Sequence, residues 1–231
     1  MVNWYLTTWW TIMAQPIYFY TKLKEEEWKE KALTFLMISS WLLAAPITLA
    51  IFIIQYVPIG STLIEGIAGW KFLIILPVLI TLAFVFFMIT FLILGGVMVI
   101  VLGVAFYIIG FALHYVYLLL GGKGDLNRML QDSFYSSAVV LAGILPIMFA
   151  ILTRYNMLDF SLFRVGYNLV YGLTLLFVYG LWAVAGRKVY GVPKWKAFAG
   201  ALLPIIFLLI FGFAFDKIAL SKLETWITPL K

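Results

Sequence analysis

Residues 118–126 read Leu-Leu-Leu-Gly-Gly-Lys-Gly-Asp-Leu, and they end a run without Lys, Arg, Asp or Glu that begins at Phe72. A water-soluble domain carries about 25% charged residues, whereas this chain of 231 residues has 11% charged and 65% hydrophobic residues. So little charge cannot cover a water-facing globule. The pattern therefore indicates an all-α, polytopic transmembrane helical bundle, because helices satisfy their own backbone hydrogen bonds in lipid and no barrel-like alternation is present.

The expected membrane domain covers residues 32–215. Its spans are expected at about residues 32–57, 72–94, 97–120, 134–153, 165–186 and 197–215, with loops at 58–70, 121–132, 154–164 and 187–196. The charge-free run is too long for one span, since about 50 helical residues reach about 75 Å against a hydrocarbon core of about 30 Å. The pair Gly95-Gly96 is the expected break, because glycine relaxes the backbone.

Two flanking segments complete the expected organisation. Residues 1–31 form an N-terminal segment with an aromatic, interfacial start and a charged, water-facing helical turn in which Glu27 and Lys31 are spaced i, i+4. Residues 216–231 form a C-terminal tail. The start lacks the features of a cleaved signal peptide, and neither end carries a lipidation motif, so the first span is expected to act as the targeting signal.

The distribution of basic residues predicts the orientation. The net charge is +6, and such an excess usually marks cytoplasmic loops. Six crossings with the N-terminus inside would leave nine Lys and Arg residues inside and seven outside. If residues 71–121 cross only once in net, the count is ten inside and six outside, which the positive-inside rule favours. Hydropathy favours six segments, so the sequence leaves five or six spans open.

Several short motifs around the Gly-Gly-Lys-Gly turn follow a familiar order. They are Leu-Gln-Asp-Ser-Phe-Tyr-Ser-Ser-Ala at 130–138, Ile-Leu-Pro at 144–146, Lys-Ala at 196–197 and Leu-Leu-Pro at 202–204, with Gln-Pro-Ile-Tyr-Phe at 15–19 near the start. Together they resemble the Yip (Ypt-interacting protein) domain family, prokaryotic type. The resemblance implies five spans and a cytoplasmic N-terminus, here in a prokaryotic plasma membrane. Eukaryotic relatives bind Rab-type GTPases in vesicle trafficking, but that activity is not carried over to this compact form.

The Gly-Gly-Lys-Gly turn is not a phosphate-binding loop. A P-loop needs Gly-x-x-x-x-Gly-Lys-Ser/Thr between a strand and a helix, whereas here Asp125 follows Gly124 and no strand precedes the turn. A glycine cap at a helix C-terminus is the favoured interpretation. The candidate contacts with anionic lipid headgroups are the basic residues of the two loops on this side, namely Lys123, Arg128, Arg187 and Lys188.

A second set of candidates forms a polar site inside the membrane. His114 is the only histidine, and an ionisable residue within a span often marks a relay or pathway. Its alternative role is a hydrogen bond to a neighbouring helix. Asn168, Tyr171 and Tyr179 share one helical face, which would line a polar cavity or, as the favoured interpretation, pack against another helix.

No recognisable catalytic motif is present, and we expect a protein that is not an enzyme and uses no cofactor or metal. The chain has no cysteine, and it lacks a basic stripe for nucleic acid. The expected function is to organise the membrane or partner proteins, with membrane lipids and other membrane proteins as partners. The alternative is a small permease or lipid-handling transporter with a cavity among proline-kinked helices. A polar cavity would favour the alternative, and a packed, dry bundle would favour the first.

Overall fold

The computed structural model describes residues 2–24, 26–64, 67 and 70–228, and this part of the chain is helical almost throughout. The elements are α1 (Val2–Ala14), α2 (Pro16–Lys22), α3 (Lys31–Ile51), η1 (Phe52–Tyr56), α4 (Val57–Ile64), α5 (Trp70–Leu119), α6 (Leu126–Tyr135), η2 (Ser136–Gly143), α7 (Ile144–Arg154), α8 (Phe160–Tyr190), α9 (Lys194–Phe215), η3 (Asp216–Leu220) and α10 (Ser221–Ile227). The described residues contain no strand. The all-α prediction is therefore confirmed.

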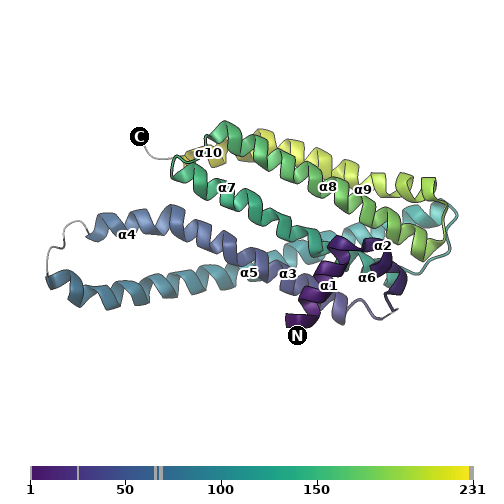
Figure 1. The fold of residues 1–231 in the computed structure, drawn as a ribbon, viewed down its shortest axis with the longest axis horizontal. Helices are drawn as coiled ribbons and strands as arrows, with labels where there is room; N and C mark the ends of the chain where they lie inside the picture. Colours follow the sequence, from purple (N-terminus) through teal and green to yellow (C-terminus); the bar gives the residue numbers. More distant parts are fainter. Residues whose placement is uncertain (1, 25, 65–66, 68–69, 229–231) are drawn as a thin grey trace.

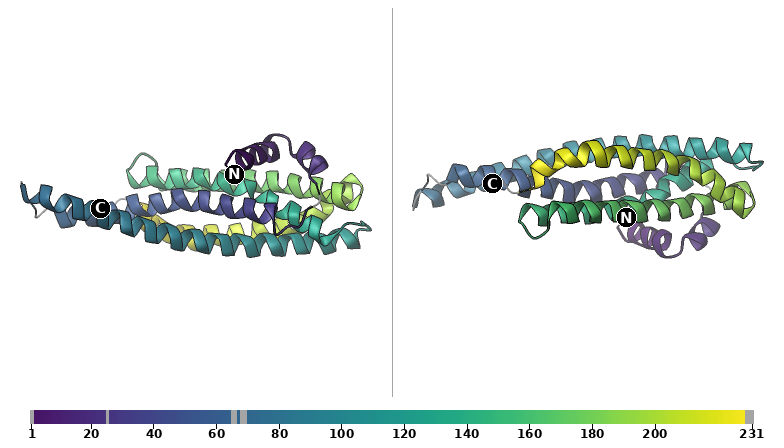
Figure 2. Two further views of the ribbon diagram at one scale, coloured as in Figure 1. Left: turned by 90° about the horizontal axis from the view of Figure 1, so that it is seen from below. Right: turned by 90° about the horizontal axis from the view of Figure 1, so that it is seen from above.

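Five long helical segments are apolar enough to cross a membrane. They run through Lys31–Thr62, Trp70–Leu119, Leu126–Arg154, Phe160–Tyr190 and Lys194–Ile227. Figure 1 shows them side by side along one axis, with α1 and α2 lying on the outside of the bundle. The two views in Figure 2 place this N-terminal pair on one face. Of the five or six spans that the sequence left open, the structure has five.

The expected break at Gly95-Gly96 is wrong, because α5 is one continuous helix of 50 residues. Gly95 serves packing. A methyl group at Gly95 would come within 2.6 Å of three ring atoms of Trp41 on α3, so only glycine lets the two helices approach this closely. An unbroken helix also keeps its backbone groups hydrogen-bonded in lipid, apart from the one bond that Pro77 removes. At 1.5 Å per residue α5 is about 75 Å long, and with α4 it forms a hairpin that projects beyond the α7–α8 turn (Figure 1).

Four expected segments also have other boundaries, mostly because helices continue past the last apolar residue. The expected loop 154–164 shortens to residues 155–159, since α8 begins at Phe160. The described part of the expected loop 58–70 is helical as far as Ile64. The basic loop 187–196 shrinks to residues 191–193, since α8 continues to Tyr190 and α9 begins at Lys194. The C-terminal segment is helical to Ile227, and residues 229–231 of the expected tail lie outside the described part.

The charged stretch near the N-terminus is not the expected helical turn. The described residues between α2 and α3 form an extended stretch and a turn. Lys31 pairs with Glu26 at 2.7 Å rather than with Glu27. The reason is tertiary, because side chains of α6 hold this stretch by its backbone, as described below.

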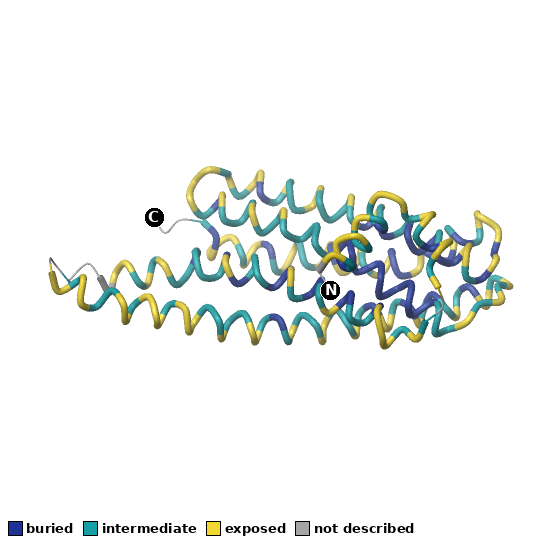
Figure 3. The backbone as a smooth tube through the Cα atoms, turned by 60° about the horizontal axis from the view of Figure 1, so that its bottom comes forward, coloured by how far each residue is buried: buried dark blue, intermediate teal, exposed yellow. Residues whose placement is uncertain are grey.

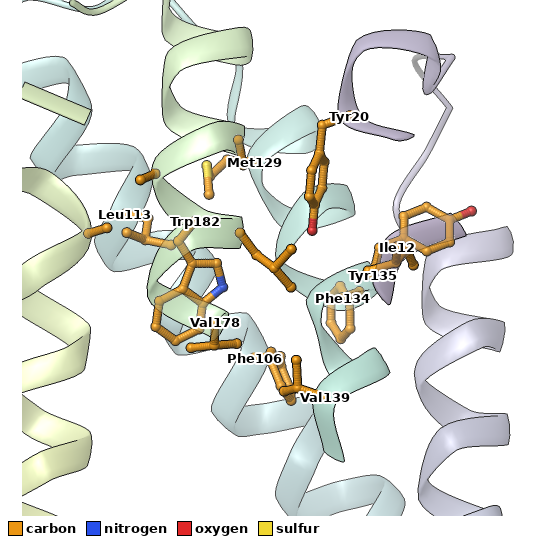
Figure 4. Packing of buried hydrophobic residues seen from close by; sticks show 14 of the residues in the cluster. Ile12, Tyr20, Phe106, Leu113, Met129, Phe134, Tyr135, Val139, Val178 and Trp182 are labelled. Atoms are coloured by element: carbon orange, nitrogen blue, oxygen red, sulfur yellow. The ribbon is translucent and has the colours of Figure 1, made fainter. Parts of the chain in front are cut away.

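The tightly packed core lies toward the end of the bundle where α6 and the α8–α9 turn meet, and the projecting hairpin is mostly exposed (Figure 3). Figure 4 shows Trp182 and Val178 of α8 facing Phe106 and Leu113 of α5. The Trp182 indole donates to the Ser136 hydroxyl at 2.9 Å. Because lipid is as apolar as these side chains, close packing and interhelical hydrogen bonds hold this end together.

Candidate functional site

The Gly-Gly-Lys-Gly turn is a glycine cap on the C-terminus of α5, as the sequence predicted. The amide of Gly122 donates to the carbonyl of Tyr117 at 2.9 Å, and that of Gly121 donates to Leu118 at 2.9 Å. With Gly121 at φ +88°, these are the two bonds of a Schellman motif. The turn is thus stabilised by its own backbone.

The same turn is also packed against the end of α8. The amide of Lys123 donates to the carbonyl of Tyr190 at 3.1 Å. A methyl group at Gly124 would lie 2.6 Å from the Tyr190 ring, so this glycine is needed for the close approach. Amides that are used within the protein do not cradle a phosphate, and the Lys123 side chain is exposed.

His114 connects two helices. Its Nδ1 shares a hydrogen bond with the hydroxyl of Tyr190, which also lies 3.4 Å from the carbonyl of Asp125. The histidine is half-buried. Within the described part of the chain, no three His, Asp or Glu side chains gather closely enough to hold a metal ion. His114 therefore takes part in an interhelical contact between α5 and α8.

The four candidate headgroup contacts fall into two kinds. Lys123, Arg187 and Lys188 are exposed, and the last two lie on the final turn of α8 rather than in a loop. Arg128 is turned inward, where its guanidinium donates to Gln131 at 3.2 Å and to the Tyr20 carbonyl at 3.5 Å. Three of the four side chains are therefore available to lipid, and the fourth is engaged within the protein.

The expected loop 121–132 is wrong in its second half, because α6 begins at Leu126. Asp125 is the N-cap, and its carboxylate accepts from the amide of Arg128 at 3.2 Å. This helix buries Asp132 completely. Neither carboxylate oxygen of Asp132 accepts a hydrogen bond from a described residue, and the Arg128 Nε lies 3.7 Å away. Hydropathy does not predict this buried carboxyl, although the i, i+4 spacing of Arg128 and Asp132 is a signal for it.

Polar side chains of α6 hold the N-terminal stretch by its backbone. Asn127 accepts from the Trp28 amide at 3.2 Å and donates to the Glu26 carbonyl at 3.1 Å. Gln131 donates to the Lys24 carbonyl at 3.0 Å. Because backbone atoms are the partners, the lysines of this stretch remain exposed next to the Gly-Gly-Lys-Gly turn.

The Asn168, Tyr171 and Tyr179 face of α8 is directed toward the C-terminal helices. Asn168 donates to Asp216 at 3.2 Å, the Tyr171 hydroxyl donates to the Leu208 carbonyl at 2.5 Å, and the Tyr179 ring packs edge-on against Phe198. Asp216 also accepts both arms of the Arg164 guanidinium, at 2.8 and 2.5 Å. All three candidates are used in helix packing. His114 does not join them, since it contacts Tyr190 at the other end of α8.

Two cavities among the described helices are apolar, whereas a third, of about 230 Å³ beside Lys22, Lys24 and Lys31, has a partly polar wall. One has a volume of about 250 Å³ and lies between α3, α7, α8 and α10. The next, of about 300 Å³, lies between α5, η2, α8 and α9. Neither is lined by His114, and the cavity walls offer few groups that could replace the water around a polar solute.

Comparison with known proteins produced no matching family model, no matching curated protein and no matching solved structure.

Proposed function

We propose that this protein is a non-enzymatic integral membrane protein of the Yip-like type, which organises membrane lipids or partner membrane proteins through one cationic end. Support for the family comes from the residues themselves: the Gly-Gly-Lys-Gly motif forms a specific turn packed on Tyr190, and the bundle has the five long helices that the family implies. The proposal places the protein in a prokaryotic plasma membrane with its N-terminus in the cytoplasm.

The single observation that carries the proposal is the gathering of basic residues at one end. Three stretches meet there: the one before α3, the Gly-Gly-Lys-Gly turn with the start of α6, and the α8–α9 turn. Ten of the sixteen Lys and Arg residues belong to them, namely Lys22, Lys24, Lys29, Lys31, Lys123, Arg128, Arg187, Lys188, Lys194 and Lys196. By the positive-inside rule this end faces the cytoplasm, where anionic headgroups attract it.

A headgroup-binding experiment tests the function. The triple variant Lys123→Gln, Arg187→Gln, Lys188→Gln removes three exposed cations from the cationic end. Each basic residue near an anionic surface contributes about 1 kcal/mol, so the affinity of the reconstituted protein for phosphatidylglycerol is expected to fall by about a hundredfold at low salt. The matched control replaces Lys71, Lys217 and Lys222, which are exposed at the opposite end, with Gln. An equal loss in both triples would overturn the proposal.

A labelling experiment tests the orientation. The chain has no cysteine, so single substitutions report on one site each. Lys123→Cys and Lys188→Cys are expected to react with an impermeant maleimide only after the membrane is opened, and Met157→Cys, 74% exposed in the α7–α8 turn, is expected to react on intact cells. Labelling of Lys123→Cys on intact cells would contradict a cytoplasmic location of the cationic end.

The second candidate function is lipid handling. The observation that favours it is the pair of apolar cavities, which both reach Pro146 of α7. A permease for polar solutes has less support, because a polar solute in these cavities would lose its hydration without gaining partners.

A further inference from the structure

The two apolar cavities adjoin each other inside the bundle. Pro146 and Tyr167 line both of them, so the first cavity, beside α10, and the second, beside α5, meet at these two residues. Together they form an elongated space with two lobes rather than one round chamber.

The third long segment lies beside both lobes. The chain runs from Ser136 to Gly143 as a 3₁₀-helix before it becomes α7. Pro146, Ile147 and Ala150 of α7 line the first lobe, and Val139, Val140 and Gly143 line the second together with Pro146.

Side chains that line the lobes are almost all aliphatic or aromatic. Ile54 and Phe163 line the first lobe, and Phe106 and Leu175 line the second. Gln55 is the polar side chain at the first lobe, and at the second the hydroxyls of Tyr171 and Thr174 donate to backbone carbonyls of their surroundings. Water has too few partners here, because an apolar cavity stays dry even at about 150 Å³ and takes up benzene or xenon instead.

Both lobes are partly open to the outside of the bundle rather than enclosed, so the acyl chains of the bilayer can reach them. An apolar occupant is therefore expected in both lobes. Another helix is too wide, since an α-helix 10–12 Å across needs about 400 to 600 Å³ for a single turn. A methylene chain is slender enough, and the surrounding bilayer supplies it at high concentration.

We propose that the two lobes are one binding site for a single lipid acyl chain, which enters the bundle from the bilayer and passes between Pro146 and Tyr167. This site is independent of the cationic end, because its lining contains none of the exposed lysines or arginines named above. Its chemistry fits the chain of a phospholipid and that of a free fatty acid alike.

Photo-crosslinking of the full-length protein in nanodiscs tests the site. Two sets of discs contain equal mole fractions of a diazirine-bearing acyl chain, one as phosphatidylcholine and the other as free fatty acid, and labelled residues are mapped by mass spectrometry. Labels are expected at lining residues such as Ile54 and Leu175 in excess of outward-facing residues such as Leu176. The set that labels them identifies the source of the chain. Labels spread evenly over the outer surface in both sets would overturn the proposal.

Filling each lobe provides a second measurement. Ala150→Trp projects an indole into the first lobe and Ala105→Trp into the second, whereas Ala199→Trp adds the same group at an exposed position of α9. Labelling of the filled lobe is expected to fall by about tenfold or more, and to stay unchanged in Ala199→Trp and in the cationic triple variant. Unchanged labelling in both filled variants would refute the site, and the wild-type map decides the matter if either variant fails to fold.

Discussion

Replacing Gly186 with alanine is expected to destabilise the bundle by about 2 kcal/mol, because the added methyl group has no room. It would lie within 2.6 Å of three ring atoms of Tyr117, a fully buried side chain of α5. That ring cannot move away, since a methyl group at Gly200 of α9 would also meet it, at 2.5 Å. The Tyr117 hydroxyl is held as well, at 3.0 Å from the carbonyls of Trp182 and Ala197.

The magnitude follows from two opposing effects. Overpacking a closed site costs about 1–3 kcal/mol. Overlap with three ring atoms places the cost at this site at about 3 kcal/mol. Alanine is favoured over glycine in a helix by about 1 kcal/mol, which leaves about 2. Gly172→Ala in the same helix is the matched control, because a methyl group there meets nothing within 4 Å among the described residues. The control is expected to gain up to about 1 kcal/mol.

Thermal unfolding of the two variants in detergent, followed by circular dichroism, measures the difference. A gap of about 3 kcal/mol corresponds to roughly 6–12 °C in Tm for a chain of this size. Gly186→Ala should cost less in a Tyr117→Leu background than in the wild type, since the overlapping ring is gone. If Gly186→Ala and Gly172→Ala unfold at the same temperature, Tyr117 is not held between α8 and α9 as described.

Three further outcomes are expected. Gly95→Ala should lower Tm, because its methyl group would overlap the ring of Trp41, whereas the neighbouring Gly96→Ala has open space and should leave Tm unchanged or raise it slightly. Asp125→Ala should cost about 0.5–2 kcal/mol in thermal unfolding through loss of the α6 N-cap, and Asp125→Asn should retain most of it. Burial raises the pKa of Tyr20 well above its ordinary value. Its contribution to stability is therefore fully present below about pH 10 and is lost as the pH rises further, so Tyr20→Phe should flatten the alkaline decline in a pH series of unfolding curves.

At the Gly-Gly-Lys-Gly turn, the neighbouring residues alone were enough to predict the end of a helix. Two adjacent glycines after a long apolar run predicted a helix end, and the structure has a Schellman motif there. The same kind of signal failed at Gly95, where glycine accommodates the ring of Trp41 instead of ending a helix. The two cases have similar local sequences. They differ in what lies opposite the glycine, which is a neighbour distant in the chain.

In the candidate site too, the surroundings of a residue depend on neighbours that are distant in the chain. Hydropathy placed Asp132 in a loop because its own segment is charged, yet α6 buries it under the N-terminal stretch. Arg128 was expected at the lipid surface for its charge alone, and it faces inward toward Tyr20. For Asn168 and Tyr171 the helical spacing did predict a shared face, and the partner of that face, α9, is visible only in the structure.

By itself, the sequence determined that this is a helical membrane protein, where its long charge-free run ends, and how its basic residues are distributed along the chain. These properties depend on the composition of neighbouring residues, because lipid excludes charged side chains and backbone groups without hydrogen bonds. Only the tertiary structure decided that α5 is unbroken, that Arg128 faces inward, and that two apolar lobes meet at Pro146 and Tyr167. Each of these depends on contacts between residues far apart in the chain, because close packing rather than hydrophobicity selects the neighbours of a helix in lipid.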